Sequence, residues 1–201
     1  MPYSHFTLKT VTKAFNITII ENEDLYSKIV PVPVSEHLMT TLNYNLPLAL
    51  AINTEKARSE LIISNVLLEV KRSLNDQISL FSGVNLEVDP EQELNGFCDY
   101  IISKSPEQYY LTAPIVTIVE AKNENIAGGL GQCIAEMKAS QLFNETEGLA
   151  SFQIYGAVTT GNVWKFLKYE SQRAYIDKVE YHITAVNKIV GILREMVKEN
   201  A

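Results

Sequence analysis

The sequence predicts an α/β domain in which helices flank a mixed β-sheet. The composition is ordinary for a globular protein with a sizeable core, with 46% hydrophobic and 20% charged residues among 201. Short runs rich in β-branched residues alternate with segments of helical periodicity. From residue 53 onward these segments follow the order α-β-β-β-α-β-β-α, and such a succession of strands and helices is typical of α/β domains.

Residues 1–52 are expected to form an N-terminal appendage, without chemistry of its own, to a main domain of residues 53–201. Residues 30–34 contain two prolines and indicate extended chain, because proline disfavours helix in the residue before it. Ser35 can then cap a short helix through Leu42.

The main domain is expected to begin with a helix over residues 53–74, for which Asn53 or Thr54 can act as the N-cap. Its apolar residues recur every three or four positions and would form one buried face. These residues are Ile63, Val66, Leu67, Val70 and Leu74.

Five strands and two further helices are expected in the rest of the chain. Turn-forming residues between the first two strands predict a hairpin, and Thr160-Gly161-Asn162 predicts a second hairpin. The strands are expected at residues 78–88, 97–102, 115–121, 152–159 and 163–169, and the helices at about 131–143 and 176–199.

The charge balance and the cysteine content exclude several classes of protein. A net charge of −7, from 17 basic and 24 acidic residues, argues against strong unaided binding of long duplex DNA. No apolar run approaches the roughly 20 residues that span a membrane. The N-terminus lacks a basic-then-apolar leader, so we expect a cytoplasmic protein without a membrane partner. Cys98 and Cys133 are expected to be free thiols, and the three histidines form no zinc motif.

A carboxylate and an ammonium group stand together at the end of the third expected strand. Glu120 and Lys122 are two residues apart and therefore project from the same face of that strand. Asp99 lies on the preceding strand among apolar neighbours. Two carboxylates from adjacent strands suit Mg²⁺, which takes one or two carboxylates and keeps waters for its substrate's phosphate. A lysine nearby can orient the attacking water or offset charge that builds on the phosphate.

The segments G-F-C-D-Y, which contains Asp99, and I-V-E-A-K, which ends at Lys122, resemble the PD-(D/E)XK nuclease superfamily. The resemblance implies a restriction-endonuclease-like mixed sheet. It also implies that Asp99, Glu120 and the carbonyl of Ala121 bind Mg²⁺, for which Mn²⁺ can substitute, and that Lys122 serves catalysis. Cys98 occupies the position of the proline in the PD-(D/E)XK motif, and this position tolerates substitution in the family.

Three further features resemble members of the same superfamily. Many members carry a glutamate on the helix before the first strand. Helical geometry favours Glu60, at the edge of the buried face, over Glu69, which falls on the polar side. Gln132 occupies the place of a glutamine in the first turn of the helix after the Glu-x-Lys strand. V-T-T-G-N-V-W-K-F, residues 158–166, resembles a hairpin in the nuclease domain of type I restriction subunits. The resemblance covers about residues 53–169.

Each of these features also has a purely structural interpretation. Glu120 and Lys122 could form a solvated ion pair worth under ~1 kcal/mol, and Gln132 could be an ordinary surface glutamine. The glycines at 128, 129 and 131 more simply let the chain turn and pack closely than cradle phosphate, because the lysine of a phosphate loop is missing. Trp164 is more simply interpreted as a core residue than as a platform on which nucleic-acid bases stack.

The leading hypothesis is a metal-dependent nucleic-acid phosphodiesterase, a DNA endonuclease of a restriction or repair system, with DNA favoured over RNA. Its basic residues should then cluster around the mouth of the site. If they do not, a larger partner subunit must hold the nucleic acid. A homodimer is also compatible with the fold. The alternative is a catalytically silent nuclease-fold binding or assembly module. A small-molecule hydrolase using the same metal stays open, because fold does not fix substrate.

Overall fold

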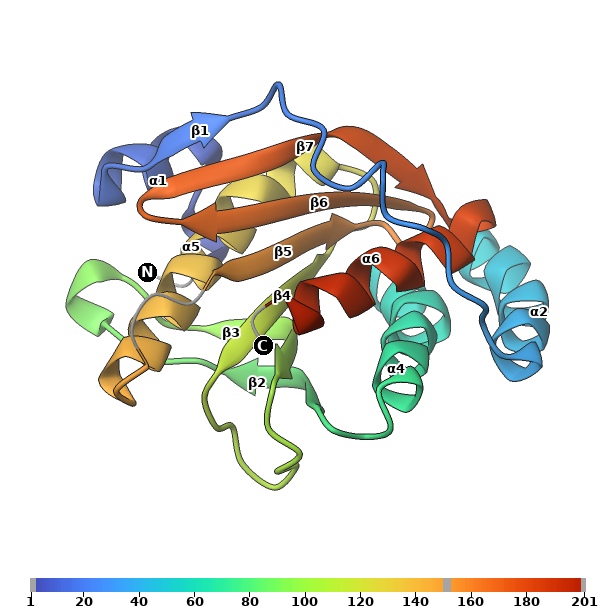
Figure 1. Ribbon diagram of the computed structural model, residues 1–201. Coiled ribbons are helices and arrows are strands. Elements are labelled where there is room, and N and C mark those ends of the chain that lie inside the picture. Colours follow the sequence, from blue (N-terminus) through green and yellow to red (C-terminus); the bar gives the residue numbers. More distant parts are fainter. Residues whose placement is uncertain (1–2, 150–152, 200–201) are drawn as a thin grey trace.

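The computed structural model describes residues 3–149 and 153–199, and a single mixed sheet runs through them. The sheet has the strand order β1-β7-β6-β5-β4-β3-β2 (Figure 1). The β1–β7 and β4–β5 pairs are parallel and the other pairs are antiparallel. The strands are β1 (Thr18–Ile20), β2 (Ser79–Asn85), β3 (Phe97–Ser103), β4 (Ile115–Ala121), β5 (Ile154–Thr159), β6 (Val163–Glu170) and β7 (Arg173–His182).

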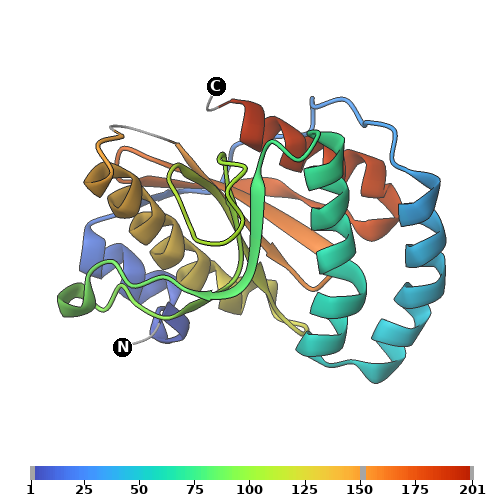
Figure 2. The same cartoon turned by 90° about the horizontal axis from the view of Figure 1, so that it is seen from below.

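Helices cover both faces of the sheet, so the predicted α/β class with a flanked mixed sheet is confirmed. Helices α1 (Leu8–Phe15) and α5 (Ile126–Thr146) lie on one side (Figure 2). Helices α2 (Glu36–Ile52), α4 (Ser64–Ser73) and α6 (Val186–Lys198) lie on the other. Each side has its own hydrophobic core, and alternate residues of the strands contribute to the two cores. No helix in the described parts of the chain is long and apolar enough to cross a membrane.

The helix expected over residues 53–74 is present, with Thr54 as its cap. It consists of α3 (Glu55–Arg58), a π-helical turn η2 (Ser59–Ile63) and α4. Four of the five residues expected on its buried face are fully buried and Leu74 is partly buried. Turns of the π type are frequent at functional sites, and this one carries Glu60.

Both predicted hairpins are confirmed. Strands β2 and β3 pair antiparallel, and so do β5 and β6. The prediction of one helix over residues 176–199 is wrong, because strand β7 occupies its first part and α6 begins only at Val186. In β7 four successive residues from Ala174 to Asp177 are buried. A strand buried on both faces lacks the alternation that distinguishes it from a buried helix.

Helix α5 begins at Ile126, before the expected start at residue 131, because the Asn125 side chain accepts a hydrogen bond from Gly128 N and caps it. The neighbouring glycines therefore lie inside the helix and do not form a turn. The expected role in close packing is confirmed for Gly129 and Gly131 but not for the exposed Gly128. A Cβ on Gly131 would lie 2.2 Å from the carbonyl carbon of Thr7, so α1 can contact α5 only over a glycine.

Residues 3–52, expected as an appendage, take part in the same sheet and cores. Strand β1 pairs with β7, and helix α1 packs on α5. Ser35 caps α2 as predicted, but that helix continues past Leu42 to Ile52. The first quarter of the chain thereby packs against α5 through α1 and against α4 through α2.

Candidate functional site

The predicted carboxylates meet where β3 and β4 pair. The register joins Tyr100 to Val119, and its continuation by one residue places Asp99 beside Glu120. Asp99 Oδ2 accepts a hydrogen bond of 2.8 Å from the backbone N–H of Ala121. The structure therefore brings together the aspartate and the Glu-x-Lys segment that the sequence places on different strands.

Glu120 is not a solvated residue at a strand edge. Its side chain is only 1% exposed and faces α5. Lys122 Nζ donates a hydrogen bond to Glu120 Oε1 and a second one, of 3.2 Å, to Gln132 Oε1. Glu120 Oε2 has no hydrogen-bond partner within the described residues. An unpartnered carboxylate oxygen in a buried place is costly, so this oxygen suits a cation.

Gln132 lies in the second turn of α5, since that helix starts earlier than expected. Its Nε2 donates a hydrogen bond of 3.0 Å to Glu136 Oε1. Glu136 is fully buried and was missed by sequence reasoning. The signal was its spacing of four residues from Gln132, which places both side chains on one face of the helix. Its apolar surround in the sequence obscured that signal.

The site carries more negative than positive charge. Burial raises the pKa of Glu120 to about 8, and the charge of Asp99 adds to this effect, whereas Lys122 opposes it. Burial also raises the pKa of Glu136 well above its ordinary value, and Glu120 raises it further. Burial works to lower the pKa of Lys122, but Glu120 and Asp99 outweigh burial and raise it. Burial and mutual repulsion thus make Glu120 and Glu136 bind protons more tightly than exposed carboxyl groups do, and an added cation would oppose this effect.

Replacement of Glu136 by glutamine should make the metal-free protein relatively more stable as the pH rises. The folded-state pKa of Glu136 lies above its ordinary value of 4.5. Its contribution to stability is therefore complete below that value and is lost as the pH rises toward the folded-state pKa. Glu120 and Asp99 face this carboxyl group and raise its pKa, whereas Lys122 lowers it.

The measurement is the Tm of both proteins in a chelator between about pH 5 and pH 9. The Tm of Glu136→Gln should gain on that of the wild type as the pH rises above 4.5 toward the folded-state pKa of Glu136. Parallel curves would mean that the Glu136 carboxyl group ionises alike in the folded and unfolded chains.

Glu60, rather than Glu69, faces the site. A cavity of about 260 Å³ opens beside Asp99. The Glu60 side chain is 60% exposed and forms an ion pair of 2.9 Å with Lys56. The expectation that Glu69 lies on the polar side is wrong, because it is buried and accepts hydrogen bonds from Ser35. The cavity is lined by Glu55, Lys56, Ser59, Glu60, Ser82, Asp99, Tyr100 and Ala121.

The predicted cluster of basic residues is not seen among the described residues that line this cavity, which include three carboxylates and a single lysine. Arg58, another residue that sequence reasoning missed, is buried and has a structural task. Its Nη1 donates to the carbonyl of Thr160 at 2.9 Å, and its Nη2 donates to Asn53 Oδ1 at 2.9 Å. Arg58 thereby ties the helix that carries Glu60 to the β5–β6 turn.

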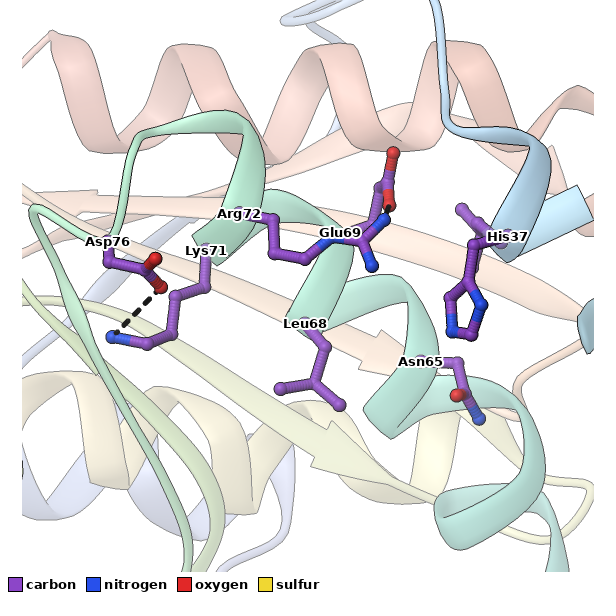
Figure 3. Close-up of a pocket in the computed structure, with 8 residues that line it drawn as sticks. His37, Asn65, Leu68, Glu69, Lys71, Arg72 and Asp76 are labelled. Atoms are coloured by element: carbon purple, nitrogen blue, oxygen red, sulfur yellow. Dashed lines mark hydrogen bonds and ion pairs between the residues drawn. The ribbon is translucent and has the colours of Figure 1, made fainter.

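A second cavity, of about 180 Å³, lies between α2 and α4 and shares no lining residue with the first (Figure 3). Its charged groups are already paired. Arg72 forms an ion pair of 2.9 Å with Glu69, and Lys71 lies 3.8 Å from Asp76. None of the predicted site residues lines this cavity, and both of its ion pairs lie within α4 and the turn that follows it.

The residues at the end of β4 fit a hard divalent cation. Among residues 3–149 and 153–199, no group of three or more His, Cys, Asp and Glu side chains is arranged to hold a metal by itself. Two carboxylates and a backbone carbonyl are nevertheless sufficient for Mg²⁺, which keeps several waters. The unpartnered Glu120 Oε2 marks the position where such an ion would relieve a buried charge.

Comparison of the sequence with protein families and with curated proteins found no match.

Proposed function

We propose that this chain is a Mg²⁺-dependent nucleic-acid phosphodiesterase of the PD-(D/E)XK type with a restriction-endonuclease-like sheet. DNA is the favoured substrate, and Mn²⁺ can replace Mg²⁺. The observation that carries the proposal is the buried Glu120 carboxylate beside Asp99. One of its oxygens is bound by Lys122, and the other has no partner within the described residues.

The residues of the proposed site would have different roles in metal binding and catalysis. Asp99, Glu120 and the carbonyl of Ala121 would hold the ion. When bound, Mg²⁺ supplies polarisation of the phosphate and a lowered pKa for the attacking water. Lys122 presents its ammonium group at the same place, where it can orient the water or offset charge on the phosphate. Glu60 lines the same cavity as Asp99 and would bind water there.

The second candidate is a nuclease-fold module that binds or assembles without cleaving. Two observations favour it. Asp99 Oδ2 is already engaged by the backbone N–H of Ala121. The cavity lining carries three carboxylates and one lysine, so a nucleic acid would be repelled unless a partner subunit or a second copy of the chain supplied positive charge.

The two candidates predict opposite results for Asp99→Asn. An asparagine oxygen can still accept the hydrogen bond from Ala121, so the fold should be kept. Loss of the ligand charge should lower cleavage at least about 100-fold, because a metal ion contributes several kcal/mol to the transition state. Asp76→Asn is the matched control, since the Asp76 carboxylate is 70% exposed in a surface ion pair.

The assay measures cleavage of single-stranded, duplex and branched DNA, and of RNA, with Mg²⁺, with Mn²⁺ and with a chelator. Metal-dependent cleavage that Asp99→Asn removes and Asp76→Asn keeps would support the nuclease. If no substrate is cut and no metal changes the Tm, the nuclease proposal is wrong and the silent module replaces it.

A further inference from the structure

A chain of hydrogen bonds runs from the proposed catalytic lysine into the core. Lys122 Nζ donates to Gln132 Oε1 at 3.2 Å, and Gln132 Nε2 donates to Glu136 Oε1 at 3.0 Å. An amide has an accepting end and a donating end, so the group that binds one end determines what the other end offers. Here the carboxylate of Glu136 accepts from the nitrogen, and the oxygen is thereby turned toward Lys122.

The reverse orientation of the amide is unfavourable at the Lys122 end. The NH₂ group of Gln132 would then face the ammonium group of Lys122, so that two donors would oppose each other. The amide oxygen would face the Glu136 carboxyl group, which could satisfy it only by donating its own proton. Gln132 is 9% exposed and Glu136 is fully buried, so bulk water cannot satisfy the mismatched groups.

We propose that Glu136 is a positioning residue for this site, acting through Gln132 on Lys122. This inference rests on the proposed nuclease function. Glu136 serves as a hydrogen-bond acceptor that fixes the Gln132 amide, and its negative charge is not required. The Gln132 oxygen then holds the Lys122 ammonium group together with Glu120 Oε1, so that the lysine stays at the end of β4.

The test compares two replacements of Glu136. Glu136→Gln keeps an acceptor oxygen and removes the charge, whereas Glu136→Leu keeps a similar volume and removes the acceptor. Loss of an outer partner of a metal site typically costs 10–100-fold. Glu136→Leu should therefore lower kcat about 10–100-fold with the KM for DNA unchanged, and Glu136→Gln should stay within about 3-fold of wild type. Glu136→Met, which also lacks the acceptor, replaces Glu136→Leu if that variant does not fold.

A second measurement does not depend on cleavage. The side-chain amide of Gln132 is followed by ¹H–¹⁵N NMR in the metal-free protein and is identified by its loss in Gln132→Ala. In wild type and in Glu136→Gln its protons should exchange slowly with solvent. In Glu136→Leu they should exchange faster and their resonances should move, because the accepting partner of the nitrogen is gone.

The outcomes separate this inference from the proposed function. If the wild type cleaves no substrate, the function fails, and the NMR measurement alone decides whether Glu136 fixes the amide. An unchanged Gln132 amide in Glu136→Leu overturns the inference. An equal loss of kcat in Glu136→Gln and Glu136→Leu also overturns it, since the charge would then be what matters. A kcat that neither variant lowers overturns it as well.

Discussion

Replacement of Lys122 by alanine is expected to lower metal-dependent cleavage at least about 100-fold, the effect of removing one charge-stabilising group from an active site. Lys122 is the cation that binds the Glu120 carboxylate, and Gln132 holds it in place. The variant should still fold. Burial already raises the pKa of Glu120 to about 8, so its carboxyl group can take up a proton when the ammonium group is removed.

The measurement is the cleavage rate of the best DNA substrate with saturating Mg²⁺, together with the Tm. Lys178→Ala is the control, because Lys178 is a half-exposed lysine whose ion pair of 3.8 Å joins it to Asp24. Cleavage by Lys122→Ala at the wild-type rate would remove Lys122 from the proposed mechanism. Loss of cleavage in both variants would point to a general effect of lost positive charge.

The largest expected effect on stability comes from Gly131→Ala, which should lower the free energy of unfolding by about 3 kcal/mol. The added Cβ would lie 2.2 Å from the Thr7 carbonyl carbon and 2.5 Å from Leu8 N. Both are backbone atoms, so no side chain can rotate away and α1 must move off α5. For a chain of this length the Tm should fall by about 6–12 °C.

Gly128→Ala is the matched control within the same helix. Its Cβ would meet only the side chain of Asn125, at 2.9 Å from Nδ2, and Gly128 is exposed. Its change in the free energy of unfolding should stay within about 1 kcal/mol, because alanine favours helix over glycine by about that amount. Equal Tm values for the two variants would show that the contact between α1 and α5 contributes little to stability.

The sequence was sufficient where the signal is local. Alternation along a strand places Glu120 and Lys122 on one face, and Asp99 lies on β3, the strand that precedes β4 in the chain and pairs with it. The residues between Asp99 and Lys122 are therefore almost enough to define the candidate site.

Pairing between distant segments explains what the sequence could not provide. Strand β1 has three residues and joins β7, which lies more than 150 residues later. Neither segment contains a sequence feature that identifies the other as its pairing partner. Glu136 was missed for a related reason. Its partner Gln132 is local, but its importance depends on Lys122 reaching Gln132 from another element.

The helix that carries Glu60 is fastened on two sides of the cavity. Arg58 joins it to the β5–β6 turn, and the Ser59 hydroxyl lies 2.7 Å from the Tyr100 hydroxyl on β3. The backbone that carries Glu60 is therefore already fixed in the folded chain beside the cavity that Glu60 and Asp99 both line. In the proposed nuclease, a backbone fixed in this way would leave more of the substrate's interaction energy for the transition state.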